Sequence, residues 1–350
     1  MGTETAIEWT DATWNPVAGC SIVSPGCTNC YAMKMAARIE RMNPAAQHYA
    51  GLTQSSKSGP VWTGKVAAAP DSILLAPLKW KKPRRIFVNS MSDLFHEDVP
   101  DEWIDQVFAV MALSPAHTFQ VLTKRAARMR DYFAGDAFDR VVLKMMVLVD
   151  WGFPTVKEAC LRAGLPYKQP TSGNDWWPLP NVWLGVSTER QQEAEERIPD
   201  LLNTPAAKHF LSCEPLLGPV MPWTADIMEK LGDAILQPGL DWVIAGGESG
   251  PGSRPSHPDW FRSLRGLCAA AGVPFFFKQW GSWQVVHDCE RDDPRGGHAD
   301  RIARTTPKGR WLNYDGGHGF HGKRVVRVVP SSKHAAGALL DGREHRDFPS

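Results

Sequence analysis

The sequence has almost no net charge. Its 350 residues include 39 lysines and arginines against 38 aspartates and glutamates, which leaves a formal charge of +1. This balance excludes a strongly basic surface, so any nucleic-acid contact must use a local patch. No apolar run approaches the ~20 residues that a membrane helix needs. The first residues show no basic segment followed by an apolar one, so we expect no secretion signal, no membrane partner and a cytoplasmic protein.

Several common catalytic motifs are missing. The chain has no G-x4-G-K-[ST] phosphate loop, no H-E-x-x-H zinc motif and no G-x-S-x-G nucleophile motif, and the sequence assigns no catalytic residue. There are seven cysteines, an odd number, which argues against a disulfide framework. Three of them, Cys20, Cys27 and Cys30, lie within one short segment, and the other four are scattered.

Short apolar runs alternate with helical patterns along most of the chain. The runs predict strands buried on both faces at Arg85–Asn89, Thr118–Leu122, Asn181–Val186, His209–Leu211, Trp242–Ala245 and Pro274–Phe277, with a further strand at Ile7–Trp9 or Thr13–Trp14. Helical patterns lie between them at Glu102–Leu113, Glu189–Leu202 and Pro258–Ala271. The alternation predicts an α/β protein with a partial or complete (β/α) TIM-like barrel.

Two regions interrupt this alternation. Residues 137–180 contain helical patterns at Val141–Val149 and Val156–Ala163 and a polar loop at Gln169–Trp177, which we interpret as a loop insertion. From residue 289 the composition changes, with a strand-like segment at Lys323–Val329 and a helical pattern at Ala335–Leu340. We therefore expect a barrel domain over 1–288, with the 137–180 insertion, and a C-terminal extension over 289–350.

The most specific motif is the C-x6-C-x2-C spacing of Cys20, Cys27 and Cys30. Thiolates are the ligands of Fe–S clusters and of structural zinc, and Pro25 and Gly26 allow the chain to bend between the first two. A helical pattern starts at Tyr31, so its first amide groups favour a negatively charged thiolate cluster.

Three alternatives are open for these cysteines. A [4Fe–4S] cluster held by three thiolates leaves one iron free to bind a small molecule through amino and carboxylate groups. A zinc ion instead needs a fourth ligand, which His48 or His96 could supply through the fold. The cysteines could also carry no metal.

The three-cysteine loop beside a first strand, followed by repeated βα units, resembles the radical S-adenosylmethionine superfamily. The chain is more closely similar to a phage-associated family of radical-SAM-like proteins of unsettled function. That resemblance is carried by Trp14–Tyr31, Phe87–His96, Val121–Arg125, Trp183–Ser187, Ser212–Gly218, Gly246–Gly250, Phe276–Gly281 and Ala336–Pro349.

The resemblance implies a partial barrel in which Cys20, Cys27 and Cys30 bind a [4Fe–4S] cluster with S-adenosylmethionine on the open iron. It implies an enzyme that forms a 5′-deoxyadenosyl radical, and hence an electron donor such as flavodoxin or ferredoxin. The cofactors carry such chemistry, and the protein positions and shields them.

Polar residues follow most of the predicted strands. In a parallel barrel these strand ends share one rim, where barrel active sites are built. We expect this rim to bind the cosubstrate through Asn89, Ser90, Asp93, Lys124, Ser187, Glu214, Glu248 and Lys278.

The substrate and two other functions stay open. The basic rim residues and the many tryptophans favour a nucleotide or nucleic-acid substrate, with another small molecule as the alternative. A second hypothesis is a non-catalytic protein with a structural zinc site. A third is a nucleic-acid-binding module that uses the basic run Lys79–Arg85 and the 137–180 insertion.

Overall fold

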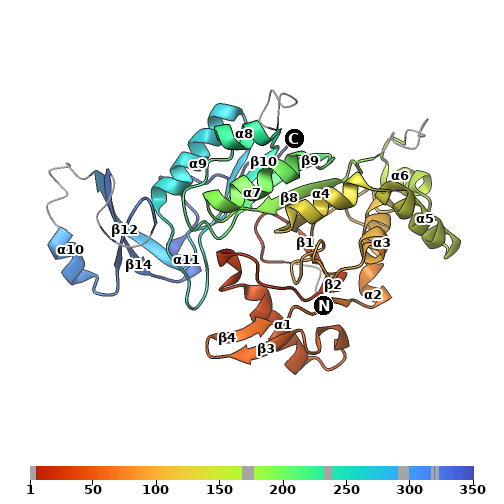
Figure 1. The fold of residues 1–350 in the computed structure, drawn as a ribbon, viewed down its shortest axis with the longest axis horizontal. Helices are drawn as coiled ribbons and strands as arrows, with labels where there is room; N and C mark the ends of the chain where they lie inside the picture. Colours follow the sequence, from red (N-terminus) through yellow and green to blue (C-terminus); the bar gives the residue numbers. More distant parts are fainter. Residues whose placement is uncertain (1–4, 168–176, 232–238, 291–298, 317–318, 320–322) are drawn as a thin grey trace. The chain divides into compact units, whose positions relative to one another are not determined.

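The computed structural model describes residues 5–167, 177–231, 239–290, 299–316, 319 and 323–350 (Figure 1). The predicted polar loop Gln169–Trp177 falls almost entirely on residues 168–176, outside this description. The chain divides into two compact units. The first is Met1–Val186 with Arg197–Phe210, and the second is Ser187–Glu196 with Leu211–Ser350.

A seven-stranded sheet forms the centre of the fold, in the order β1-β6-β7-β8-β9-β10-β11. The pairs β1–β6, β6–β7, β7–β8 and β10–β11 are parallel. The sheet strands are β1 (Ala12–Trp14), β6 (Arg85–Val88), β7 (Thr118–Thr123), β8 (Val182–Ser187), β9 (Lys208–Cys213), β10 (Trp242–Ala245) and β11 (Phe275–Phe277). The six predicted strands are therefore confirmed, and the first strand lies at Thr13–Trp14 rather than at Ile7–Trp9.

The fold is mixed α/β, and its sheet is consistent with a partial β/α barrel. The strand order has two ends, β1 and β11. The C-terminal segment covers the β11 end, because Arg346 bridges Phe276 in antiparallel fashion and Phe277 donates a backbone hydrogen bond to His345. Covering an edge strand in this way hides its unpaired backbone groups.

Helical patterns in the sequence predict most helices of the first unit, but not α2 (Asp71–Leu74) or α4 (Ala126–Ala134). The others are α1 (Tyr31–Met42), α3 (Asp101–Ala112), α5 (Ala137–Asp150) and α6 (Val156–Ala163). Helices α5 and α6 confirm the two helical patterns of the predicted insertion, and α5 packs against α3 (Figure 1). A capping box between Thr155 and Glu158 starts α6, and Gly164 ends it with a left-handed conformation.

Several short strands and 3-10 turns complete the first unit. They are β2 (Val17–Ala18), β3 (Thr53–Ser56), β4 (Gly59–Trp62), β5 (Ala67–Ala68), and the short 3-10 helices η1 (Pro25–Cys27), η2 (Gln47–Tyr49) and η3 (Pro77–Lys79). A core cluster that includes Met33, Leu52, Trp62 and Met91 packs α1 against the β3–β4 hairpin. This packing fixes the direction in which α1 leaves Cys30.

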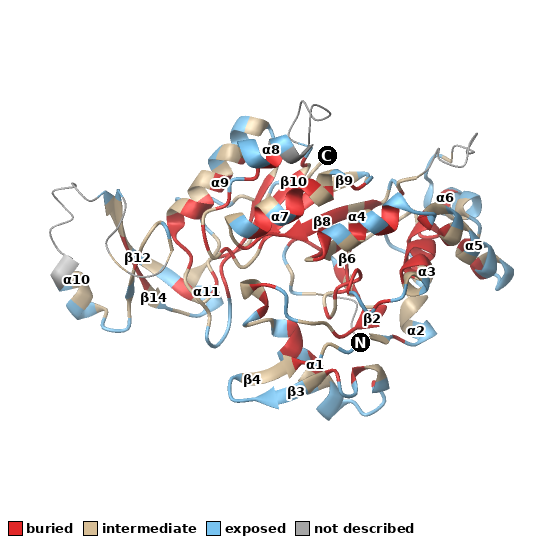
Figure 2. Cartoon of the chain, viewed as in Figure 1, coloured by how far each residue is buried: buried red, intermediate tan, exposed pale blue. Residues whose placement is uncertain are grey.

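The remaining elements are α7 (Gln191–Leu202), α8 (Ala225–Leu231), α9 (Pro258–Ala271), β12 (Trp283–Glu290), α10 (Ala299–Thr305), β13 (Arg310–Leu312), β14 (Arg324–Pro330) and α11 (Lys333–Ala336). Strands β12, β14 and β13 form a separate antiparallel sheet. Strand β10 is fully buried, as Figure 2 shows in red. The predicted strand Lys323–Val329 is confirmed by β14. The short helix predicted near Ala335–Leu340 is present as α11, but it begins earlier, at Lys333, and ends before Gly337, which has a positive φ of 74°.

Candidate functional site

The cysteine loop has a defined backbone path. Cys27 ends the 3-10 turn η1 and donates its N–H to the carbonyl of Ser24, and Cys30 donates to the carbonyl of Cys27. Helix α1 starts one residue after Cys30. Gly19 directs the chain into this loop with φ of 94°, and a Cβ there would lie 2.1 Å from the carbonyl oxygen of Lys65, so only glycine fits.

The three thiols lie close enough to affect one another. Burial raises the pKa of Cys20 to about 12, and the negative charges of Asp93, Cys27 and Cys30 add to this effect. Burial also raises the pKa of Cys30, although the backbone N–H groups of Ala32 and Met33 act in the opposite direction. A thiol at the start of α1 is thus aimed at helix N–H groups, as the sequence predicts for a thiolate ligand.

The donor set fits a thiolate-bound metal group in its chemistry. It combines three thiols with two cationic neighbours: Arg125 donates from Nη1 to Cys20 Sγ at 3.7 Å, and the charge of Lys124 partly opposes the rise that burial causes in the pKa of Cys30. Within the described part of the chain, no group of three or more His, Cys, Asp or Glu side chains is arranged to hold a metal ion.

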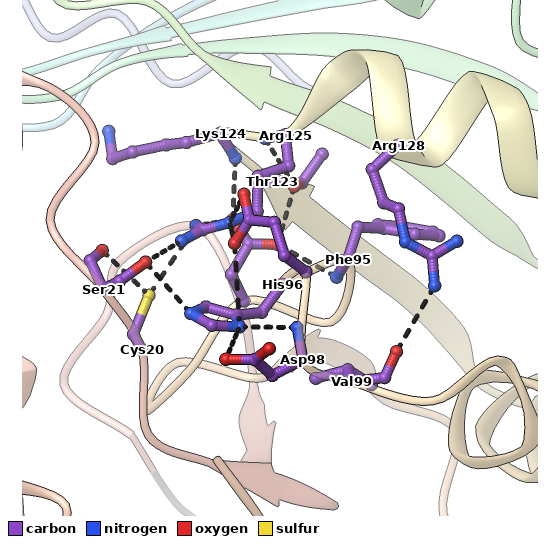
Figure 3. A network of polar contacts seen from close by, with 12 residues as sticks. Cys20, Ser21, Phe95, His96, Asp98, Val99, Thr123, Lys124, Arg125 and Arg128 are labelled. Atoms are coloured by element: carbon purple, nitrogen blue, oxygen red, sulfur yellow. Dashed lines mark hydrogen bonds and ion pairs between the residues drawn. The ribbon is translucent and has the colours of Figure 1, made fainter. Parts of the chain in front are cut away.

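Arg125 is the centre of a buried polar network beside Cys20 (Figure 3). Its side chain is 5% exposed and pairs with Asp93 at 3.0 Å and with Glu97 at 3.0 Å. Its Nη2 donates to Ser21 Oγ at 2.7 Å. Burial alone lowers the pKa of Arg125, but the charges of Asp93, Cys20 and Glu97 outweigh it and raise the pKa. The guanidinium is therefore a permanent cation next to the first cysteine.

Asp93 accepts hydrogen bonds from its own loop after β6 and from the end of β7. Its Oδ1 accepts from Thr123 Oγ1 at 2.6 Å and from the Phe95 N–H at 3.0 Å. Its Oδ2 accepts from the Lys124 N–H at 2.9 Å and from Arg125. The predicted site residues Asp93 and Lys124 are thus brought together, and the carboxylate of Asp93 fixes Arg125 toward Cys20.

His96 is the candidate fourth ligand that the fold brings to the cysteine loop. Its Nδ1 accepts from the Asp98 N–H at 3.1 Å, so Nε2 carries the proton and donates to Ser21 Oγ at 3.0 Å. Burial and the charge of Arg125 lower the pKa of His96, which keeps the imidazole neutral. His48 instead packs against the ring of Tyr49 in a tilted arrangement, with 4.6 Å between the ring centroids.

Asn89 and Ser90 also meet the cysteine segment, through its backbone and through Asn15. Asn89 has a positive φ of 58°, and its Oδ1 accepts from the Val17 N–H at 3.2 Å. Ser90 Oγ donates to Asn15 Oδ1 at 3.1 Å. Asn89 Nδ2 is buried and has no hydrogen-bond partner among the residues that the structure describes. These two predicted site residues therefore fasten the end of β6 to the segment that leads to Cys20.

The other four predicted site residues belong to the second unit. Glu214 pairs with Lys278 at 3.2 Å, and the two side chains are 15% and 19% exposed. Glu214 lies across Gly246, where a Cβ would be 2.5 Å from Glu214 Oε1. Ser187 is buried at the end of β8. The ion pair between Glu214, which follows β9, and Lys278, which follows β11, therefore lies beside Gly246 at the end of β10.

Glu248 has a specific partner that the sequence did not indicate. Its carboxylate accepts from the guanidinium of Arg254 at 2.5 and 2.9 Å and from the Arg254 N–H at 2.7 Å. This bidentate pair closes the loop that follows Gly247. Arg254, Ser21 and Glu97 were missed because nothing in their local sequence marks them; each is identified only by the side chain that it meets.

The fold and the site define a mixed α/β protein with a three-cysteine loop beside a buried Arg–Asp pair. The model of a family described as "Protein of unknown function (DUF5131)" matches residues 4–349, so the chain belongs to this family. No curated protein and no solved structure matches the chain. Within its described residues, no helix combines the length and the apolar character needed to cross a membrane.

Proposed function

We propose that the protein is a radical S-adenosylmethionine enzyme of the cytoplasm, built on a partial TIM-like barrel, whose Cys20, Cys27 and Cys30 hold a [4Fe–4S] cluster. The observation that carries the proposal is the thiol loop itself. Its three sulfurs influence one another electrostatically, one of them faces the N–H groups of α1, and two cations lie beside the loop. Burial keeps Cys20 and Cys30 protonated in the free loop. On metal binding they would lose their protons, and Arg125, Lys124 and the helix N–H groups would stabilise the resulting thiolates.

When bound, the cluster would supply an electron to S-adenosylmethionine and so release methionine and a 5′-deoxyadenosyl radical for hydrogen abstraction from a substrate. The chain's own residues have separate tasks. Arg125 neutralises charge at Cys20, and Asp93 holds Arg125 in place. Asn89, Ser90 and Lys124 in the first unit, and Ser187, Glu214, Glu248 and Lys278 in the second, are the proposed contacts for the polar parts of cosubstrate and substrate, for which we propose a nucleotide or nucleic acid.

Quantification of iron, sulfide and zinc in protein purified without oxygen tests this function. About four irons and four sulfides per chain would support it. Cys27→Ala should lose the cluster and release no 5′-deoxyadenosine, whereas Cys160→Ala, which removes a buried cysteine of α6, should keep both. Thermal unfolding of each variant shows whether the fold survives. Normal cofactor cleavage by Cys27→Ala would contradict the assignment.

A structural zinc site is the second candidate, and the position of His96 favours it. His96 shares Ser21 Oγ with Arg125, one residue from Cys20. This candidate predicts one zinc and no iron per chain, and loss of the zinc in both Cys27→Ala and His96→Ala. That result would support a metal-stabilised binding protein over the enzyme.

A further inference from the structure

The outer face of α1 combines apolar and basic side chains directly after Cys30. Tyr31, Met35 and Met42 are 52%, 38% and 63% exposed, although large apolar side chains are usually buried. Their spacing of four and seven residues places them on one face of the helix. Ile22 and Val23, in the loop between Cys20 and Cys27, are also exposed.

The charges on this helix face have one sign. Lys34, Arg38 and Arg41 are exposed and lie along the apolar row. In the part of the chain that the structure describes, none of the three forms an ion pair with a carboxylate. The one acidic residue of α1, Glu40, points elsewhere, because its carboxylate accepts from the Gly51 N–H at 2.8 Å. The face is therefore an exposed apolar row with uncompensated positive charge.

We infer that this face of α1, together with Ile22 and Val23, is the docking surface for a small acidic protein that carries single electrons. The inference rests on the proposed function, because a cluster at Cys30 must receive electrons from outside. Helix α1 starts at the residue after Cys30, so a carrier bound to its first turns would approach the cysteine loop. Charge complementarity selects an acidic partner and speeds its encounter. The apolar row favours a protein over a nucleic-acid backbone, which needs cations but no exposed methionines.

The test uses reduced flavodoxin as the acidic carrier and compares two double variants. Lys34→Gln/Arg38→Gln removes two charges from the α1 face, and Lys157→Gln/Arg162→Gln removes a matched lysine and arginine from the exposed surface of α6. We expect the α1 variant to bind flavodoxin roughly tenfold more weakly at low salt and to lose most of the salt dependence of binding. The α6 variant should bind as the wild type does. Met35→Gln should weaken binding without changing its salt dependence.

A second readout separates docking from the cluster chemistry. With the cluster in place, the α1 variant should accept electrons from flavodoxin more slowly but from dithionite, a small reductant, at the wild-type rate. Equal flavodoxin binding by the wild type and the α1 variant would overturn the inference. So would an α1 variant that loses binding to a single-stranded oligonucleotide and not to flavodoxin. If the purified protein contains no cluster, the proposed function fails, yet flavodoxin binding that depends on α1 would still support the docking surface.

Discussion

Arg125 donates a hydrogen bond to the sulfur of Cys20 across 105 residues of sequence, with 3.7 Å between Nη1 and Sγ. The contact joins the start of α4 to the cysteine loop, and the same guanidinium also meets Asp93, Glu97 and Ser21. Since the side chain is 5% exposed, these partners replace water almost completely. The first cysteine is therefore anchored by a buried cation and not only by its own loop.

Arg125→Met should destabilise the protein by about 3–5 kcal/mol, because it leaves the buried carboxylate of Asp93 without its cation. Arg125→Lys should cost less, since it keeps the charge but cannot reach all four partners. Chemical denaturation measures both effects. The control is Arg128→Met on the next turn of α4, where the pair with Asp101 is partly exposed, with side chains 30% and 43% accessible, and where we expect about 1 kcal/mol or less. Equal losses at the two arginines would contradict a special role for Arg125.

Much of the sheet could be predicted from the sequence, because continuous apolar runs report strands buried on both faces. The run Trp242–Ala245 gives β10 without error. Strand β12 could not be found in this way, since it is only partly buried and contains His287, Asp288 and Glu290. The antiparallel partner β14 holds it in place, and pairing across a long chain separation leaves no local signal.

The candidate site was predictable in its composition but not in its contacts. Close spacing identified Cys20, Cys27 and Cys30, and strand ends identified Asp93 and Lys124. The interaction of Arg125 with Cys20 depends on how β7 lies relative to the cysteine loop, which the sequence does not encode locally. Glu248 shows the same limit, because its position after two glycines is visible while its pairing with Arg254 is not.

Gly185→Ala should destabilise the protein, because β8 has no room for a side chain at this position. A Cβ on Gly185 would lie 2.5 to 2.6 Å from the ring of the fully buried Phe210. Overpacking of this kind costs about 1–3 kcal/mol. Gly266→Ala is the matched control, since Gly266 lies within α9 and a Cβ there meets nothing within 4 Å. That variant should gain about 0.5–1 kcal/mol from helix propensity. The melting temperature and the urea midpoint should fall for Gly185→Ala and rise for Gly266→Ala. A change in the same direction in both variants would contradict the packing argument.

His257 should make the free energy of unfolding depend on pH, because its neutral imidazole caps the N-terminus of α9. Its Nδ1 accepts from the Asp259 N–H at 3.1 Å. Its Nε2 is buried and has no hydrogen-bond partner in the described regions. Burial lowers the pKa of His257; Arg262 and Arg324 also lower it, while Asp259 and Asp288 oppose the shift. Protonation would therefore place an extra charge in a buried position and remove the acceptor that caps the helix.

The direction of this pH effect follows from proton binding in the two states. In the unfolded chain the histidine takes up a proton near pH 6.5, and in the folded protein only at lower pH. Between these two pKa values the unfolded state binds more protons than the folded state. The stability that the neutral His257 imidazole contributes is therefore fully present above pH 6.5. It is lost as the pH falls toward the folded-state pKa, by up to about 1.4 kcal/mol per pH unit. His257→Asn keeps a capping oxygen without the titration, so urea unfolding at pH 7 and pH 5 should differ less in this variant than in the wild type. His334→Asn, at an exposed position in α11, should leave the wild-type difference unchanged. An identical pH dependence in His257→Asn and the wild type would assign the acid sensitivity to other groups.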